Sequence, residues 1–216
     1  MEVFLALFIT FEGIEGSGKS TQMGFLKRHM EGRGMEVLTL REPGGTRLGE
    51  RVRSILLNSS EEPVDPWAEL FLYEACRAQL VSLVIRPSLE AGATVICDRF
   101  TDSTLAYQGY GRGLDLDAVS RANLLAAGGL KPDITVLIDC EAEEGLRRAW
   151  SRIGSKEGGA REDRFEKEDV SFHRRVREGY LRIAEAEPDR VKVVDGGGEI
   201  STIHREICYI VEKAGA

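Results

Sequence analysis

The sequence predicts an α/β fold in which a five-stranded parallel sheet carries helices on both faces. Five apolar runs of β-strand character alternate with helical segments along the 216 residues. The first run leads directly into the glycine-rich stretch GIEGSGKS, and charged residues follow the second and third runs. Strands joined by helices run parallel, so their carboxyl ends meet at one edge of the sheet, where ligands of such folds bind.

The predicted strands are short apolar runs, and the predicted helices show apolar residues on one face or helix-start signals. The strands are 4–11, 36–40, 94–97, 134–139 and 191–194. The helices are 20–30, 47–58, 65–86, 117–127, the segment after Asp169, and the segment from Ile200, in which Ile200, Ile203, Ile207 and Ile210 share one face. Asp65 suits an N-cap because Pro66 follows at the first helical position, and Pro87 should kink or end that long helix.

Composition describes an ordinary globular protein and excludes several classes. Hydrophobic residues make up 42% and charged residues 30%, and the net charge of −7 argues against a nucleic-acid groove binder. The apolar N-terminal run enters the glycine-rich loop directly, so it is interpreted as a strand, and no run reaches the roughly 18 residues of a membrane helix. The four cysteines form no C-x-x-C pair, which favours a reduced, cytoplasmic protein without a zinc site. We expect one domain over residues 1–216.

GIEGSGKS fits the pattern G-x-x-x-x-G-K-[ST] of a phosphate-binding loop. Gly13, Gly16 and Gly18 let the backbone turn tightly, so that successive N–H groups and the start of the next helix face an anion. Lys19 can reach the β- and γ-phosphates, and the Ser20 hydroxyl is placed to hold Mg²⁺. The motif predicts nucleoside triphosphate binding, which kinases, GTPases and ATPase motors share.

A second group of polar residues predicts an anionic second substrate. Tyr73 and Arg77 lie four residues apart on one helix face, where a ring can stack on a base and a guanidinium can grip a phosphate. Asp98 and Arg99 directly follow the third strand and suit the surroundings of Mg²⁺ and an acceptor phosphate. The segment that follows supplies neutral groups able to read a base edge: Ser103, Thr104, Tyr107 and Gln108.

The glycine-bearing segment 152–166 does not fit a packed core. It is either a solvated loop or a lid that closes over the substrate and brings cations to the transferring phosphoryl group. Its candidate catalytic cations are Arg152, Arg161 and Arg164. The histidines are interpreted as structural or exposed, without a nearby cysteine or histidine partner: His29, His173 and His204.

Over nearly its whole length the chain resembles thymidylate kinases (dTMP kinases). The resemblance rests on the following motifs: FEGIEGSGKST, REPGGT (41–46), the spacing of Tyr73 and Arg77, CDRFTDSTLAYQGYGRG (97–113), PDITVLID (132–139) and DRFE (163–166). It implies a phosphate-loop nucleoside monophosphate kinase-like fold and transfer of the γ-phosphoryl group of ATP to dTMP, giving dTDP, with Mg²⁺. It also implies a homodimer formed through the long helix of Tyr73 and the helix near Asp117.

Site roles follow from the same resemblance, position by position. The ATP-binding residues are Gly13, Gly16, Ser17, Gly18, Lys19, Ser20 and Thr21. The dTMP-binding residues are Glu15, Pro43, Tyr73, Arg77, Arg99, Ser103, Thr104 and Gln108. The metal-binding residues are Ser20, Asp98 and Glu166, and the catalytic residues are Lys19, Arg99 and the arginines of the lid.

Two positions depart from the family pattern. Tyr73 stands where phenylalanine is usual, which keeps a stacking ring and adds a hydroxyl. Gly16 stands where some members carry arginine, so the chain is similar to the bacterial subtype whose catalytic arginine comes from the lid. The nearest alternative is another phosphate-loop nucleoside or nucleoside monophosphate kinase, with Glu15 or Asp98 as a base. A distant alternative is a phosphate-loop switch ATPase, which would need a water-positioning residue and switch loops.

Overall fold

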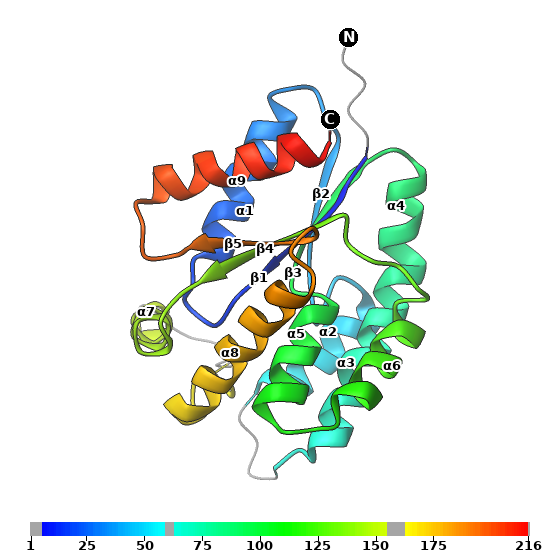
Figure 1. The fold of residues 1–216 in the computed structure, drawn as a ribbon. Helices are drawn as coiled ribbons and strands as arrows, with labels where there is room; N and C mark the ends of the chain where they lie inside the picture. Colours follow the sequence, from blue (N-terminus) through cyan, green and yellow to red (C-terminus); the bar gives the residue numbers. More distant parts are fainter. Residues whose placement is uncertain (1–5, 59–62, 155–162, 216) are drawn as a thin grey trace.

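The computed structural model describes residues 6–58, 63–154 and 163–215. Within these residues, five strands form one sheet in the order β2-β3-β1-β4-β5, and every neighbouring pair is parallel (Figure 1). The strands are β1 (Phe8–Glu12), β2 (Val37–Arg41), β3 (Thr94–Asp98), β4 (Ile134–Asp139) and β5 (Val191–Asp195). The predicted fold class is therefore confirmed. The strand ends lie within one residue of the expectation except at β1, which begins at Phe8 although the predicted strand began at residue 4.

Helices connect consecutive strands and continue to the end of the described chain. They are α1 (Lys19–Glu31), α2 (Arg47–Leu57), α3 (Pro66–Leu80), α4 (Arg86–Glu90), α5 (Thr101–Thr104), α6 (Leu116–Ala126), α7 (Ala142–Gly154), α8 (Val170–Ala186) and α9 (Ile200–Ala214). Two π-helical segments, η1 (Val81–Ile85) and η2 (Leu105–Gly111), extend α3 and α5. None of the helices described is both long enough and apolar enough to cross a bilayer.

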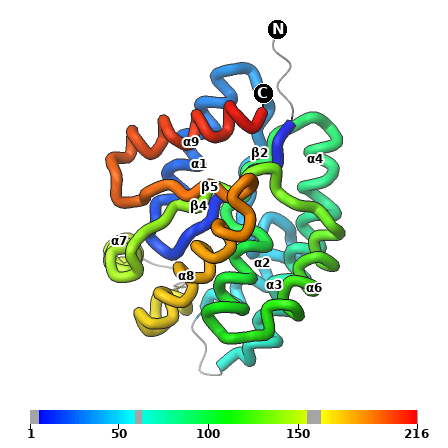
Figure 2. The backbone as a smooth tube through the Cα atoms, viewed as in Figure 1, coloured from blue at the N-terminus to red at the C-terminus, as the bar shows by residue number. Residues whose placement is uncertain are grey.

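The two faces of the sheet are covered by different helices, as the tube view makes clear (Figure 2). On one face α1 and α9 lie side by side, and Leu26 and Ile207 pack against Ile9 and Phe11 of β1. On the other face Phe8 of the same strand packs with the α3–α4 region and Phe100. Successive side chains of a strand point to opposite faces, so burial of every residue in β1 reflects a core on both sides.

The long helix does not end at Pro87. The α-helical pattern stops at Leu80, and the chain continues through η1 into α4, which reaches Glu90. Arg86 N–H donates to the carbonyl of Val81, five residues earlier. Pro87 has no N–H to donate, and the wider hydrogen-bonding pattern just before it lets the helix pass the proline. The helical conformation of 101–111 was likewise not predicted.

Candidate active site

The carboxyl ends of β1, β2 and β3 meet beside a cavity of about 1130 Å³. Phe11 of β1 lies next to Asp98 of β3, which lies next to Arg41 of β2. This volume exceeds the roughly 300–1,000 Å³ of a typical pocket for one small molecule. The predicted site residues that line it are Glu15, Gly16, Ser17, Gly18, Lys19, Ser20, Thr21, Pro43, Tyr73, Arg77, Asp98, Arg99, Ser103, Thr104, Tyr107, Gln108, Arg152 and Glu166.

Close packing around position 16 requires a glycine there. Its φ of 72° lies in the left-handed region, and a Cβ there would be 2.0 Å from the carbonyl oxygen of Gly145. A Cβ on Gly145 would in turn meet the carbonyl oxygen of Glu15 at 2.5 Å. The start of α7 therefore packs directly on the phosphate loop, and this packing leaves no room for an arginine side chain at position 16. Gly13 is similarly close to β4, since a Cβ on this residue would lie 2.4 Å from the carbonyl oxygen of Ile138.

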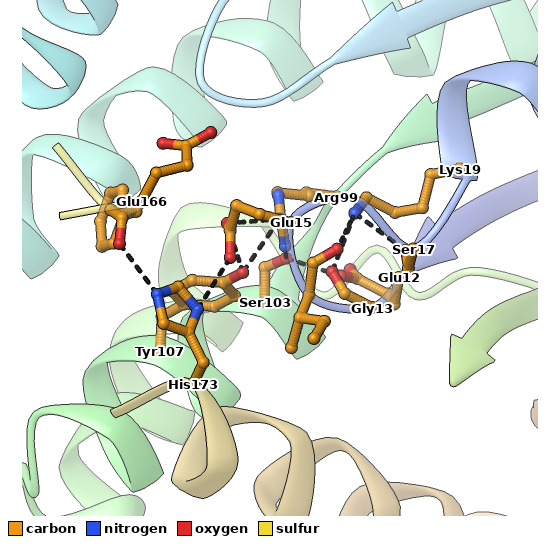
Figure 3. Close-up of polar contacts among 12 residues, drawn as sticks. Glu12, Gly13, Glu15, Ser17, Lys19, Arg99, Ser103, Tyr107, Glu166 and His173 are labelled. Atoms are coloured by element: carbon orange, nitrogen blue, oxygen red, sulfur yellow. Dashed lines mark hydrogen bonds and ion pairs between the residues drawn. The ribbon is translucent and has the colours of Figure 1, made fainter. Parts of the chain in front are cut away.

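Lys19 is held inside the loop by the main chain. Its Nζ donates to the carbonyls of Gly13 at 2.9 Å and Ile14 at 2.8 Å, as the close-up shows (Figure 3). Burial and the nearby Arg99 lower the pKa of the ammonium to about 8, against the opposing effect of Asp98 and Glu15. An anion bound to the loop would favour the charged form of Lys19.

Two of the three predicted metal ligands, Ser20 at the start of α1 and Asp98 at the end of β3, lie next to each other. The Ser20 hydroxyl donates to Asp98 Oδ2 at 3.3 Å, and Asp98 Oδ1 is buried without a hydrogen-bond partner. A hydroxyl and a carboxylate with an unused oxygen are ligands that Mg²⁺ accepts, so these two residues fit the ion. Glu166 lies beside Arg152, with 3.8 Å between its Oε1 and Arg152 Nη2.

Arg99 lies at the centre of a buried polar cluster. Its Nη2 donates to Glu15 Oε1 at 2.9 Å and to the Tyr107 hydroxyl at 2.9 Å (Figure 3). Its Nη1 donates to Ser103 and Tyr180. The backbone of Arg99 has a φ of 72°, a conformation that costs a non-glycine residue about 1–3 kcal/mol. Such strain persists only where the surroundings over-determine it, which is typical of functional sites.

Glu12 is a buried support of this cluster that the sequence analysis did not single out. Its carboxylate is fully buried and accepts hydrogen bonds from Phe100 N–H at 2.8 Å, Ser103 at 2.5 Å and Tyr180 at 2.8 Å. Burial and the charge of Asp102 raise the pKa of Glu12 to about 7. Its place as the last residue of β1, at the sheet edge where ligands bind, was the available signal.

His173, which the sequence analysis interpreted as structural or exposed, is buried next to Glu15. Its side chain is fully buried, and Nε2 donates to the Phe165 carbonyl at 2.9 Å. Nδ1 lies 3.2 Å from Glu15 Oε2, within ion-pair distance, although the angle is too poor for a hydrogen bond. Burial raises the pKa of Glu15, but Arg99 and His173 outweigh it and the net shift is downward. His173 thus links the predicted lid to the phosphate loop.

Arg77 is fully buried, and its donors are engaged by the protein. Nε and Nη2 donate to Glu42 at 3.0 and 2.7 Å, and Nη1 donates to Glu74 and Asn123. Nη2 also donates to the Thr104 hydroxyl at 2.9 Å. Arg77 therefore forms the floor of the cavity and orients Thr104, whereas the sequence suggested that it grips a phosphate directly.

Glu69, one turn before Tyr73 on α3, accepts hydrogen bonds from three polar side chains. This fully buried carboxylate accepts from Gln108 Nε2 at 2.8 Å, from Arg112, and from Arg164. Arg164 also donates to the Leu56 carbonyl at 2.9 Å and is not among the residues that line the cavity. Of the three candidate lid arginines, the structure thus brings Arg152 to the cavity and Arg164 to Glu69.

Arg161 lies outside the described residues. The structure adds Arg148, which lines the cavity from α7, one turn before Arg152. Its Nη1 donates to the carbonyl of Gly196 at 3.1 Å. The i, i+4 spacing of Arg148 and Arg152 was the signal that could have revealed it.

The other two histidines also have partners, contrary to expectation. His204 Nε2 lies 3.6 Å from Cys208 Sγ, and the ring centroid of His29 lies 6.0 Å from that of His204. They lie between α1 and α9, on the helix pair that covers one face of the sheet.

Comparisons with known proteins agree on one family. A family model described as thymidylate kinase matches residues 11–207. The curated thymidylate kinases of Geotalea daltonii and Citrifermentans bemidjiense are each 53% identical over 91% of this chain, and they are covered to 92% and 87%. A crystal structure of thymidylate kinase from Ehrlichia chaffeensis superimposes with a TM-score of 0.75 at 35% identity, covering 95% of this chain and 98% of that one.

Proposed function

Since this chain belongs to the thymidylate kinase family and phosphorylates dTMP to dTDP, we propose that ATP is the donor, that Mg²⁺ is the cofactor, and that both nucleotides bind in the 1130 Å³ cavity. The observation that carries this proposal is the presence of two cationic centres in one cavity. Lys19 lies in the phosphate loop, and Arg99 faces it from the end of β3. One cation serves each anionic substrate. This family membership favours the dTMP kinase over the other phosphate-loop kinases and the switch ATPase.

On the donor side, the main chain of 13–21 and Lys19 bind the phosphates of ATP. Ser20 and Asp98 would hold Mg²⁺, with Glu166 as a further carboxylate near the lid. When bound, Mg²⁺ neutralises charge on the β- and γ-phosphates. Arg148 completes this side because α7 is held against the loop by the contact of Gly16 with Gly145.

On the acceptor side, Arg99 binds the phosphate of dTMP while Glu15 and Tyr107 fix its guanidinium. Tyr73 stacks on the base, and Pro43 closes the pocket beside it. Ser103, Thr104 and Gln108 face the base edge as neutral polar groups, supported from behind by Glu12, Arg77 and Glu69. Arg77 acts through Thr104.

Transfer itself needs alignment and charge neutralisation more than proton chemistry. The acceptor is a phosphate oxygen that is already ionised, since its second pKa is about 6. Arg152 supplies the cation that stabilises the charge spreading over the γ-phosphoryl group. Closure of a lid over 152–166 would exclude water, which otherwise competes as acceptor.

The same proposal includes a homodimer in a reducing compartment. Large apolar side chains are exposed on α3 and α6, with Phe71 61% and Leu125 81% accessible, and these helices pack against each other. An exposed apolar patch of this kind fits a symmetric helical interface. All four cysteines are buried and unbridged, which supports a cytoplasmic location.

A phosphotransfer assay over a panel of acceptors tests the proposal. With ATP and Mg²⁺, dTMP should have a far higher kcat/KM than AMP, GMP or CMP. Purines need more room, and cytosine presents a reversed hydrogen-bond pattern that leaves buried groups unpaired. Comparable kcat/KM for dTMP and AMP would contradict the assignment of the base pocket, and full turnover in the presence of a strong Mg²⁺ chelator would contradict the assignment of the cofactor.

A further inference from the structure

A cluster of two imidazoles and one thiol lies between α1 and α9, away from the active site. His204 and Cys208 occupy consecutive turns of α9, and His29 faces them from the last turns of α1. One ligand atom from each of these three residues lies within 4.8 Å of the others. His29 is ten residues beyond Lys19, so about 15 Å of helix separates the cluster from the phosphate loop.

The spacing of Cys208 and His204 matches a transition-metal site, and His29 offers a third ligand atom within 4.8 Å of theirs. Cys208 Sγ lies 3.6 Å from His204 Nε2 and 3.7 Å from Nδ1. A tetrahedral zinc ion with bonds of about 2.3 Å to sulfur and 2.0–2.1 Å to nitrogen would place two such ligands about 3.5 Å apart. Two nitrogens and a sulfur are ligands of borderline-soft ions, whereas Mg²⁺ prefers oxygen.

The surroundings support ligation. Burial, His29 and Arg28 lower the pKa of His204, which favours the neutral imidazole that binds a metal ion. Glu212 Oε1 lies 3.0 Å from His29 Nε2, and carboxylates in this position orient metal-binding imidazoles. Glu212 also pairs with Arg33, which offsets part of its negative charge. Burial raises the pKa of the Cys208 thiol to about 11, so a metal ion must displace its proton.

We propose that His29, His204 and Cys208 form a binding site for one zinc ion, with Glu212 as the carboxylate that supports His29. On binding, the Cys208 S–H bond breaks, a Zn–S bond forms and the proton goes to solvent. The ion joins the end of α1 to α9 and stabilises the helix pair that covers this face of the sheet (Figure 2). The site is independent of phosphoryl transfer.

The test uses untagged full-length protein in excess Mg²⁺, so that the Mg²⁺ site is occupied throughout. Zn²⁺ is titrated by calorimetry, and Co²⁺ is added as a spectroscopic probe because a cobalt–thiolate bond gives a charge-transfer band. The variants are Cys208→Ser and His29→Gln, and Cys140→Ser is the matched control because it removes a buried thiol elsewhere. Turnover with dTMP checks that each variant is folded.

We expect one equivalent of Zn²⁺ to bind wild type and Cys140→Ser, with release of a proton and a cobalt–thiolate band. Cys208→Ser should lose the band, and both site variants should bind at least tenfold more weakly with unchanged turnover. Zn²⁺ at a hundredfold excess over its Kd should raise the wild-type Tm by about 5–10 °C. No Zn²⁺ binding by wild type, or a cobalt–thiolate band that survives in Cys208→Ser, would overturn the proposal.

Discussion

Replacing His173 with leucine should weaken both acid resistance and dTMP binding. The imidazole is fully buried, donates from Nε2 to the Phe165 carbonyl, and places Nδ1 3.2 Å from Glu15 Oε2 (Figure 3). Leucine fills a similar space but removes both contacts. Glu15 then keeps Arg99 and Tyr107 as partners for one oxygen, while Oε2 loses the group that faces it.

Leucine leaves the carbonyl of the buried Phe165 without its donor, which costs about 1–3 kcal/mol and corresponds to a fall in Tm of about 3–9 °C for a domain of this size. The pH dependence follows from the pKa of Glu15, which lies below its ordinary value of 4.5 in the folded protein. A depressed carboxyl pKa contributes stability above pH 4.5 that is lost as the pH falls below it. Without His173, burial pushes this pKa upward, so the variant should unfold at a higher pH than wild type.

The experiment combines acid denaturation curves with steady-state kinetics. Because Glu15 fixes Arg99, we expect the KM for dTMP to rise about tenfold, a change of about 1.4 kcal/mol, with the KM for ATP unchanged. His204→Leu is the control, since it removes a histidine on the opposite face of the sheet. His173→Asn, which keeps one donor, should recover part of the loss. Equal changes in both KM values, or an acid midpoint equal to that of wild type, would refute the link between His173, Glu15 and the acceptor site.

Three further predictions concern charge. Lys19→Ala should lower turnover a hundredfold or more without unfolding the protein, measured by phosphotransfer and circular dichroism, because a cation on the transferring group is lost; wild-type turnover would reject the loop assignment. Arg152→Ala should lower kcat about a thousandfold with little change in dTMP affinity. Arg164→Ala should instead mainly lower stability, because its contact with Glu69 is lost. A thousandfold loss of kcat in Arg164→Ala with a loss of stability alone in Arg152→Ala would exchange their roles. Glu12→Gln should gain stability relative to wild type as the pH rises from 4.5 to about 7, by up to about 3 kcal/mol. The folded-state pKa of Glu12 lies above its unfolded value, so wild type loses stability across this range, and denaturant unfolding at several pH values that shows no such trend would contradict the argument.

The fold was readable from the sequence because its signals are local. Apolar runs mark the strands, and Asp65 with Pro66 marks the start of α3, where the Asp65 side chain accepts from Trp67 N–H. The segment 101–111 was missed as a helix because its π-helical part depends on packing against α8 and not on an apolar repeat. Of the two outcomes expected at Pro87, an end of the helix was wrong, because sequence rules assume an α-helical hydrogen-bond pattern, which η1 replaces.

The sequence by itself determined the family, the phosphate loop and the sheet edge where the site lies, since each depends on residues close together in the chain. Only the tertiary structure decided which side chains contact one another at this edge of the sheet. Two of the lid arginines lie in similar sequence contexts but in different places in the fold: Arg152 lines the cavity, and Arg164 donates a hydrogen bond to Glu69. His173, 158 positions after Glu15, contacts it from α8, which packs against α5, α7 and η2. Such contacts join residues that are far apart in the chain. The charge state of the buried groups in them depends on neighbours that the fold brings together, and no local sequence pattern shows these neighbours.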